Sequence, residues 1–165
     1  MALSIDEIIL SWPGKSAQAP YYVEHPAVFH MLDVAAVAEQ LIGSFNHPDC
    51  LREAMIFLIA LHDLGKISEG FRRMLRGQAA APKFRHWEVS EFMLLHHDKS
   101  VARALGGDPR KREILYAAVA GHHGRPSALK LPSLTSRRIR FGPKDEALKI
   151  ASSGISSANE VIEHF

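Results

Sequence analysis

The sequence has very little cysteine: among its 165 residues, Cys50 is the one thiol. A single thiol cannot form an internal disulfide, and it excludes the cysteine-rich sites that hold structural zinc. Long apolar runs are also missing, because the longest, residues 54–61, is far shorter than the roughly 18 residues that span a bilayer. The first ten residues carry acids and no base, unlike a secretory signal. We therefore expect a cytoplasmic protein that makes no contact with a membrane.

Signs of β-structure are scarce as well. The chain contains no run of β-branched residues and no Asn-Gly pair of the kind that closes a hairpin. It has no internal repeat and no low-complexity tract. Hydrophobic residues make up 47% of the chain and charged residues 23%, which excludes general disorder and allows a real core. We predict one all-α globular domain over residues 1–165.

Apolar residues recur at the three- and four-residue spacing of helices. Ser4 and Glu7 form a capping box at the start of the first helix, and the turn pair Pro13-Gly14 ends it. In the second helix one stripe, expected to face the core, consists of His30, Val34, Val37 and Leu41. We expect helices over residues 4–12, 26–43, 49–64, 69–76, 86–97, 109–122, 144–151 and 155–163, with an extended loop over 125–142.

The third of these helices is the most apolar. Residues 54–61 are apolar on every side of the helix, which is typical of a central helix that is buried all round. Gly65 is expected to end it after Leu64. Since His62 shares a helical stripe with Met55 and Leu58, it is predicted to point into the core.

Histidine is the residue type in excess, with ten copies, and one of them precedes an unusual aspartate. Asp63 follows nine uncharged residues at the C-terminal end of the apolar helix. Burying a carboxylate is costly unless it is paired or binds a metal, and the C-terminus of a helix disfavours an anion. Either Lys66 or a metal ion must therefore compensate for Asp63.

Other helices contribute further imidazoles from an end or an inward face. These are His30, His86, His122 and His123. Each has a plain alternative, because a lone buried histidine is more often a hydrogen-bonded core residue, and a histidine pair suits a solvated helix C-terminus. Taken with Asp63, the four favour a first-row transition-metal site between helices.

The remaining five histidines are assigned no role. Two lie beside prolines in loops, one lies at the chain end, and two precede Asp98 in what looks like an exposed helix end. They are His25, His47, His96, His97 and His164.

Charge is unevenly distributed along the chain. Residues 1–65 hold two basic and eight acidic side chains, whereas residues 66–165 hold eighteen basic and ten acidic ones. Such asymmetry favours a basic face that could bind a polyanion. In the expected loop, Arg137, Arg138 and Arg140 beside Phe141 are candidates for contact with a phosphate backbone, the alternative being a solvated loop.

Four motifs occur along the chain in an order that is found in a known protein family. His30, then HDLGK (62–66), HWEVS (86–90) and GHHG (121–124) resemble the HD superfamily of metal-dependent phosphohydrolases. The set is most similar to the HD nuclease domain of the CRISPR-associated helicase–nuclease of type I interference systems. WPGKS (12–16) and the residues around His30 are similar to N-terminal motifs of that family.

This resemblance implies the roles of particular residues. The family's metal ligands fall on His30, His62, Asp63, His86, His122 and His123, with Asp63 bridging two ions, and Asp63 and Lys66 are the catalytic candidates. The family has one more aspartate on a later helix. After His123 this chain has only Asp145, Glu146, Glu160 and Glu163 as acids, so we expect it to lack that helix and the helicase motor.

The resemblance also implies an activity and partners. It predicts cleavage of single-stranded DNA by phosphodiester hydrolysis in CRISPR interference, an antiviral defence, with a helicase domain or subunit and an RNA-guided surveillance complex as partners. Nitrogen-rich ligation favours one or two ions of manganese, iron, cobalt or nickel, with magnesium as a further candidate. Two alternatives stay open: a phosphohydrolase acting on nucleotides or cyclic nucleotides, and a degenerate domain that keeps its histidines for structure or partner binding.

Overall fold

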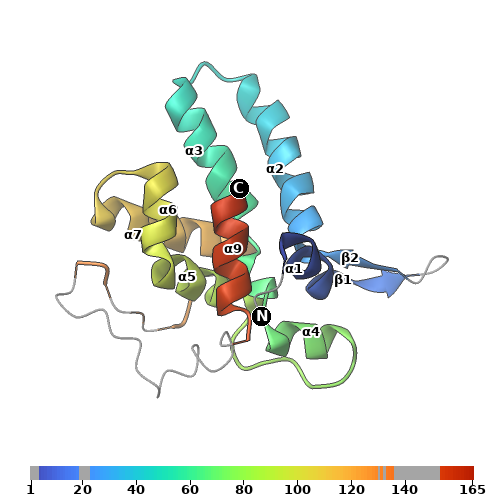
Figure 1. Cartoon of the computed structure of the whole chain (residues 1–165). Coiled ribbons are helices and arrows are strands. Elements are labelled where there is room, and N and C mark those ends of the chain that lie inside the picture. Colours follow the sequence, from blue (N-terminus) through green and yellow to red (C-terminus); the bar gives the residue numbers. More distant parts are fainter. Residues whose placement is uncertain (1–3, 19–22, 130, 132, 136–152) are drawn as a thin grey trace.

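The structure, a computed structural model, describes residues 4–18, 23–129, 131, 133–135 and 153–165. Helices dominate these residues, and the predicted all-α class is confirmed (Figure 1). The helices are α1 (Ile5–Ser11), α2 (Ala27–Gly43), α3 (Asp49–Ala60), α4 (Glu69–Leu75), α5 (His86–His96), α6 (Asp98–Leu105), α7 (Pro109–Ala120) and α9 (Ile155–His164), with 3-10 turns η1 (Leu64–Lys66) and η2 (Gly121–His123). The expected helix over 144–151 lies outside the described residues.

A short antiparallel strand pair, which the sequence pattern does not predict, joins α1 to α2. β1 (Pro13–Gln18) pairs with β2 (Val23–Pro26), so Pro13-Gly14 begins a strand. The pair is held in place by its ends, because the amide of Ala27 donates to the carbonyl of Trp12 at 2.7 Å and both residues are buried. This tertiary anchoring replaces the β-propensity that the two segments lack.

Helices α2 and α3 form a hairpin that projects from the rest of the molecule (Figure 1). The prediction that α3 is buried all round is wrong, because only Leu58 and Ala60 within the helix are buried. The helix ends at Ala60, earlier than predicted, and a tight turn follows. The stripe predicted for α2 is also wrong in its outer half: the side chains of Val37 and Leu41 are 60% and 62% exposed.

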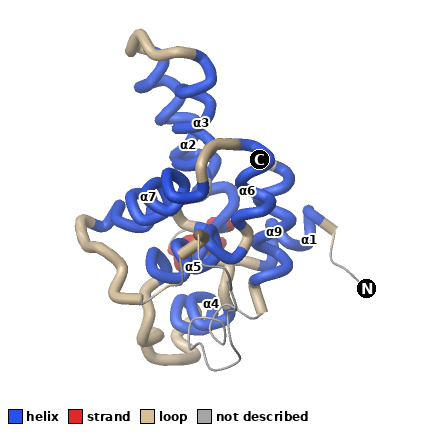
Figure 2. The backbone as a smooth tube through the Cα atoms, turned by 90° about the vertical axis from the view of Figure 1, so that its left-hand side faces the viewer, coloured by secondary structure: helices blue, strands red, loops and turns tan. Residues whose placement is uncertain are grey.

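The central helix is α5. Seven of its eleven residues are buried, and it packs against η1 and α7 (Figure 2). Figure 2 shows α5 between α7, α4 and α9. Its large buried side chains include Phe92, Met93 and Leu94, each fully buried. The first residue of this helix is His86, so the best-packed element of the protein positions one of the candidate ligands.

The predicted exposed end at His96, His97 and Asp98 is wrong. Asp98 begins α6, an additional helix that packs against α9. Its carboxylate receives two hydrogen bonds from Arg112 of α7 and one from the hydroxyl of Tyr116. His97 lies partly buried at the junction of α5 and α6. Asp98, Arg112 and Tyr116 therefore form a hydrogen-bonded cluster that joins α6 to α7, which we call the clasp.

The described part of the chain contains no helix that is both long enough and apolar enough to cross a membrane. α9 lies beside α1 and α6 and brings the end of the chain back to the core. Its start at Gly154 packs directly on the backbone of Ile67, where an added Cβ would lie 1.7 Å from the Ile67 carbonyl oxygen. The C-terminal segment thereby supports the turn that follows the His62-Asp63 pair.

Candidate metal centre

Four segments, distant in sequence, place the candidate ligands around Asp63. His30 comes from the first turn of α2, and His62 and Asp63 lie in the turn after α3. His86 opens α5, whereas His122 and His123 form η2 at the end of α7. All six residues that the resemblance names as ligands are thus brought together.

The turn that carries Asp63 is fixed against α5 by two residues of the motifs. The amide of Gly65 donates to the hydroxyl oxygen of Ser90 at 2.8 Å, and that hydroxyl donates to the carbonyl of His86 at 3.0 Å. A Cβ at position 65 would lie 1.9 Å from the His86 carbonyl oxygen. Only glycine permits this approach, so Gly65 and Ser90 set the distance between Asp63 and His86.

One oxygen of the Asp63 carboxylate faces the N-terminal ligands and the lysine. Oδ2 lies 3.2 Å from Nε2 of His30, 3.2 Å from Nε2 of His62 and 2.7 Å from Nζ of Lys66. Lys66 is itself buried, with a side chain 9% exposed. The ion pair with Lys66 therefore balances the buried carboxylate, as one of the two sequence alternatives predicted.

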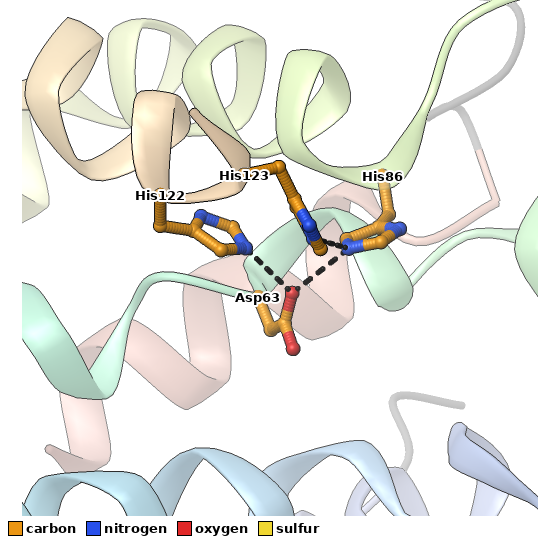
Figure 3. Close-up of side chains that lie close together, drawn as sticks. All are labelled: Asp63, His86, His122 and His123. Carbon is orange, nitrogen blue, oxygen red and sulfur yellow. Dashed lines mark hydrogen bonds and ion pairs between the residues drawn. The ribbon is translucent and has the colours of Figure 1, made fainter. Parts of the chain in front are cut away.

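The other oxygen faces the C-terminal ligands. Oδ1 lies 3.2 Å from Nε2 of His86 and 3.6 Å from Nε2 of His122 (Figure 3). Nε2 of His123 lies 2.9 Å from Nε2 of His86. Figure 3 shows these three imidazoles converging on one side of Asp63, while α2 passes on the other. One carboxylate thus divides its two oxygens between two groups of imidazoles.

The protonation of two of these rings is set by the backbone. Nδ1 of His62 donates to the carbonyl of Ile59 at 2.8 Å, and Nδ1 of His122 donates to the carbonyl of Val119 at 2.8 Å. Because a carbonyl can only accept, Nδ1 of each ring keeps its proton, and Nε2 is the nitrogen that would offer a lone pair to a metal whenever the ring is neutral. This backbone anchoring is the usual support of a metal-binding histidine.

These residues fit divalent ions. Asp63 Oδ1 is buried and has no hydrogen-bond partner among the described residues, although two imidazole nitrogens approach it. Two ligand atoms that both bind one ion at about 2.1 Å are separated from each other by about 3.0–3.4 Å when the coordination is octahedral or tetrahedral. In each of two groups the ligand atoms lie within 4.8 Å of one another: Asp63, His86, His122 and His123, and His30, His62 and Asp63.

Electrostatics keep the Asp63 carboxylate charged and favour the neutral form of two imidazoles, those of His30 and His123. Burial opposes the charge on Asp63, but the imidazoles of His122, His62 and His86 outweigh it and hold the pKa of Asp63 well below its usual range. Burial, with the charge on Lys66, lowers the pKa of His30. Burial also lowers the pKa of His123. The last two rings therefore offer lone pairs near neutral pH.

The surroundings include a contact that sequence reasoning missed. The ring of Trp87 packs on the exposed His123, with ring centroids 4.5 Å apart. The position of Trp87 directly after His86 in the HWEVS motif was the available signal. Outside the centre, His25 pairs with the exposed Asp33 at 3.0 Å.

The two later acids that the structure describes, Glu160 and Glu163, are not part of the centre. Glu163 pairs with Arg103 and accepts a hydrogen bond from Ser100, and neither it nor Glu160 belongs to a described ligand group. Asp145 and Glu146, like the candidate DNA contacts Arg137, Arg138 and Arg140, lie outside the described residues.

An all-helical fold with an adjacent His-Asp pair ringed by histidines from other helices defines a domain of the HD type. The family model described as Cas3, HD domain matches residues 12–160, and the chain belongs to this family, whose members are metal-dependent hydrolases of CRISPR systems. The curated proteins and solved structures compared with the chain include no significant match.

Proposed function

We propose that this domain is a metal-dependent nuclease that hydrolyses phosphodiester bonds of single-stranded DNA in CRISPR interference. The observation that carries the proposal is the division of the Asp63 carboxylate: Oδ1 faces His86 and His122, whereas Oδ2 faces His30 and His62. A carboxylate placed in this way is suited to bridging two ions, and the imidazoles complete the two ligand groups.

The residues of this chain would hold and orient the reacting groups. Two divalent ions, when bound, supply an activated water and Lewis-acid stabilisation of the attacking and leaving oxygens. Asp63 fixes the spacing between the two ligand groups, and the backbone carbonyls behind His62 and His122 fix the ring orientations. Lys66 neutralises Asp63 and places its positive charge beside the site where a phosphate would lie.

Family membership and charge support DNA as the substrate. The family acts in CRISPR systems, which implies a helicase partner and a DNA strand. Residues 66–165 carry the excess of basic side chains, which favours binding of a polyanion. His122 and His123 are exposed, so this side of the described centre borders solvent.

The test combines metal analysis with a cleavage assay. The purified protein is stripped of metal, reloaded with manganese, iron, cobalt, nickel or magnesium, and incubated with circular single-stranded DNA, circular duplex DNA, and mononucleotides or cyclic nucleotides. We expect metal-dependent linearisation of the single-stranded circle. Hydrolysis of nucleotides alone would instead support a nucleotide phosphohydrolase, and metal binding without any hydrolysis would support a structural site.

A further inference from the structure

An apolar groove borders the metal centre, because His62 and His122 belong to its lining. It has a volume of about 550 Å³ and lies between α2, α3 and α7. Its walls include Val34 of α2, Ile59 of α3, and Leu115 and Ala118 of α7. This volume falls within the range of about 300–1,000 Å³ that is usual for ligand-binding pockets.

The groove and the metal centre share two residues. His62 and His122 line the groove, and the Nε2 atoms of the same two rings approach opposite oxygens of Asp63. Their ring centroids are 5.0 Å apart, in an edge-on arrangement. A molecule whose phosphate is held at Asp63 would therefore have its neighbouring chemical group at the mouth of this groove.

The lining decides which chemical group can enter. The described residues that line the groove include no acid, no lysine or arginine, and no hydroxyl or amide side chain; apart from the two imidazoles they are aliphatic or thioether groups. A phosphate would lose its hydration there without compensation. A flat group with apolar faces would lose little hydration free energy, and it could pack between Val34 and Leu115.

We propose that this groove receives the nucleobase next to the scissile phosphate, an inference that rests on the proposed nuclease function. Bases drawn out of a stack are commonly held between apolar side chains. A base within a duplex is stacked and paired, and so cannot enter, which gives a physical reason for a single-strand requirement. Because the lining has few hydrogen-bonding groups, the groove accepts any base and reads no sequence.

The test uses two neighbouring alanines of α7. Ala118 lines the groove and is exposed, so Ala118→Trp fills the groove without disturbing the core. Ala117 is also exposed but is absent from the groove lining, so Ala117→Trp is the matched control. Binding of a labelled oligothymidylate, and of a matched strand with abasic sugars, is measured by fluorescence anisotropy without added metal. Cleavage of both strands is then measured with manganese.

Since stacking of one base is worth roughly a tenfold change in affinity, we expect Ala118→Trp to weaken oligothymidylate binding and to lower kcat/KM by about tenfold. Ala117→Trp should match the parent protein, and the abasic strand should be insensitive to both changes. Manganese affinity should be equal in all three proteins. Equal behaviour of the two tryptophan variants, or a defect that follows from lost manganese affinity, would overturn the inference.

The two proposals fail separately. If the parent protein binds the oligothymidylate and Ala118→Trp weakens that binding, but no strand is cut, the groove assignment stands and the nuclease function falls. If the parent protein cuts the strand and both tryptophan variants cut it equally well, the nuclease stands and the groove assignment falls. In that case a protein segment, such as a helix of a partner, becomes the better occupant.

Discussion

At the scale of single residues, Asp63 is the group on which the centre depends. Its side chain is 3% exposed and lies among four imidazoles and one lysine. Asp63→Asn keeps the volume but removes the charge that attracts cations and bridges the two ligand groups. We expect metal affinity to fall by more than about 100-fold, with cleavage lost and helical content retained.

Calorimetric metal titration, circular dichroism and the cleavage assay check this prediction. Asp33→Asn is the matched control, because Asp33 is 68% exposed and pairs only with His25 among the described residues. An Asp63→Asn protein that bound metal and cut DNA as the parent does would show that the mechanism is wrong.

Gly65 gives a second prediction at this scale. In Gly65→Ala the new methyl would lie 1.9 Å from the carbonyl oxygen of His86 and 2.5 Å from the amide nitrogen of Ser90, both of them rigid backbone atoms. We expect a loss of about 1–3 kcal/mol in the free energy of unfolding, because α5 must shift away from the turn. Urea denaturation measures it. Gly43→Ala, where nothing lies within 4 Å, should be neutral or slightly stabilising.

Much of the site could be predicted from the sequence because its parts are short motifs. His62, Asp63 and Lys66 lie within five consecutive residues, so their closeness follows from chain geometry alone. The division of the Asp63 oxygens could not be predicted in this way. It depends on how α2 and α5 approach the turn from opposite sides, and that approach is set by Gly65, Ser90 and the core beneath them.

At the scale of elements, the clasp between α6 and α7 holds the helix that leads to His122 and His123. Arg112 binds both oxygens of Asp98 at 2.7 and 2.8 Å and donates to the carbonyls of Gly106 and Gly107. Arg112→Leu would leave the partly buried Asp98 without its cationic partner, with only the hydroxyl of Tyr116 still donating to it among the described residues. We expect this variant to lose about 3–5 kcal/mol of stability in urea denaturation. Arg110→Leu, at an exposed position of the same helix, should change little; an equal loss in both variants would contradict the role of the clasp.

The junction of α5 and α6 makes stability depend on pH. Burial, with a smaller contribution from the neighbouring His96, lowers the pKa of His97 from 6.5 to about 4, and its ring hydrogen-bonds to the backbone of Ile155. Because the folded-state pKa is below the unfolded value, only the unfolded chain gains a proton as the pH falls below about 6.5. Stability contributed by neutral His97 is therefore complete above pH 6.5 and is lost progressively down to about pH 4.

His97→Gln removes this dependence. Allowing for partial exposure, the parent should lose on the order of 1–2 kcal/mol more than the variant between pH 7 and 4, in urea denaturation followed across that range. His47→Gln, in an exposed loop, is the control and should follow the parent. Parallel pH profiles for the parent and His97→Gln would contradict the argument.

Elements with strong local signals were predicted well. The capping box of Ser4 and Glu7 marks the start of α1, and α2, α4, α5, α7 and α9 lie within two residues of their expected ends. The strand pair was missed because its pairing is enforced by the buried ends of Trp12 and Ala27. The burial of α3 was predicted wrongly because composition shows that a helix is apolar but not where in the fold it lies. An apolar helix in a projecting hairpin leaves one face uncovered, and that face of α3 lines the groove.

At the scale of the whole molecule, the two ligand groups around Asp63 are unequal. Three imidazoles and Oδ1 form one group, whereas two imidazoles and Oδ2 form the other. Lys66 lies 2.7 Å from Oδ2, so its positive charge opposes a cation on that side. We predict that the group containing His86, His122 and His123 fills first and that the second group needs excess metal.

The most direct test of a divided metal centre at Asp63 is anomalous diffraction from crystals of the protein grown with manganese. At limiting manganese we predict one strong peak between Asp63 Oδ1 and the imidazoles of His86, His122 and His123. With excess manganese, a second and weaker peak should appear between Oδ2, His30 and His62. The absence of any peak at Asp63, with manganese bound elsewhere or not at all, would contradict the account.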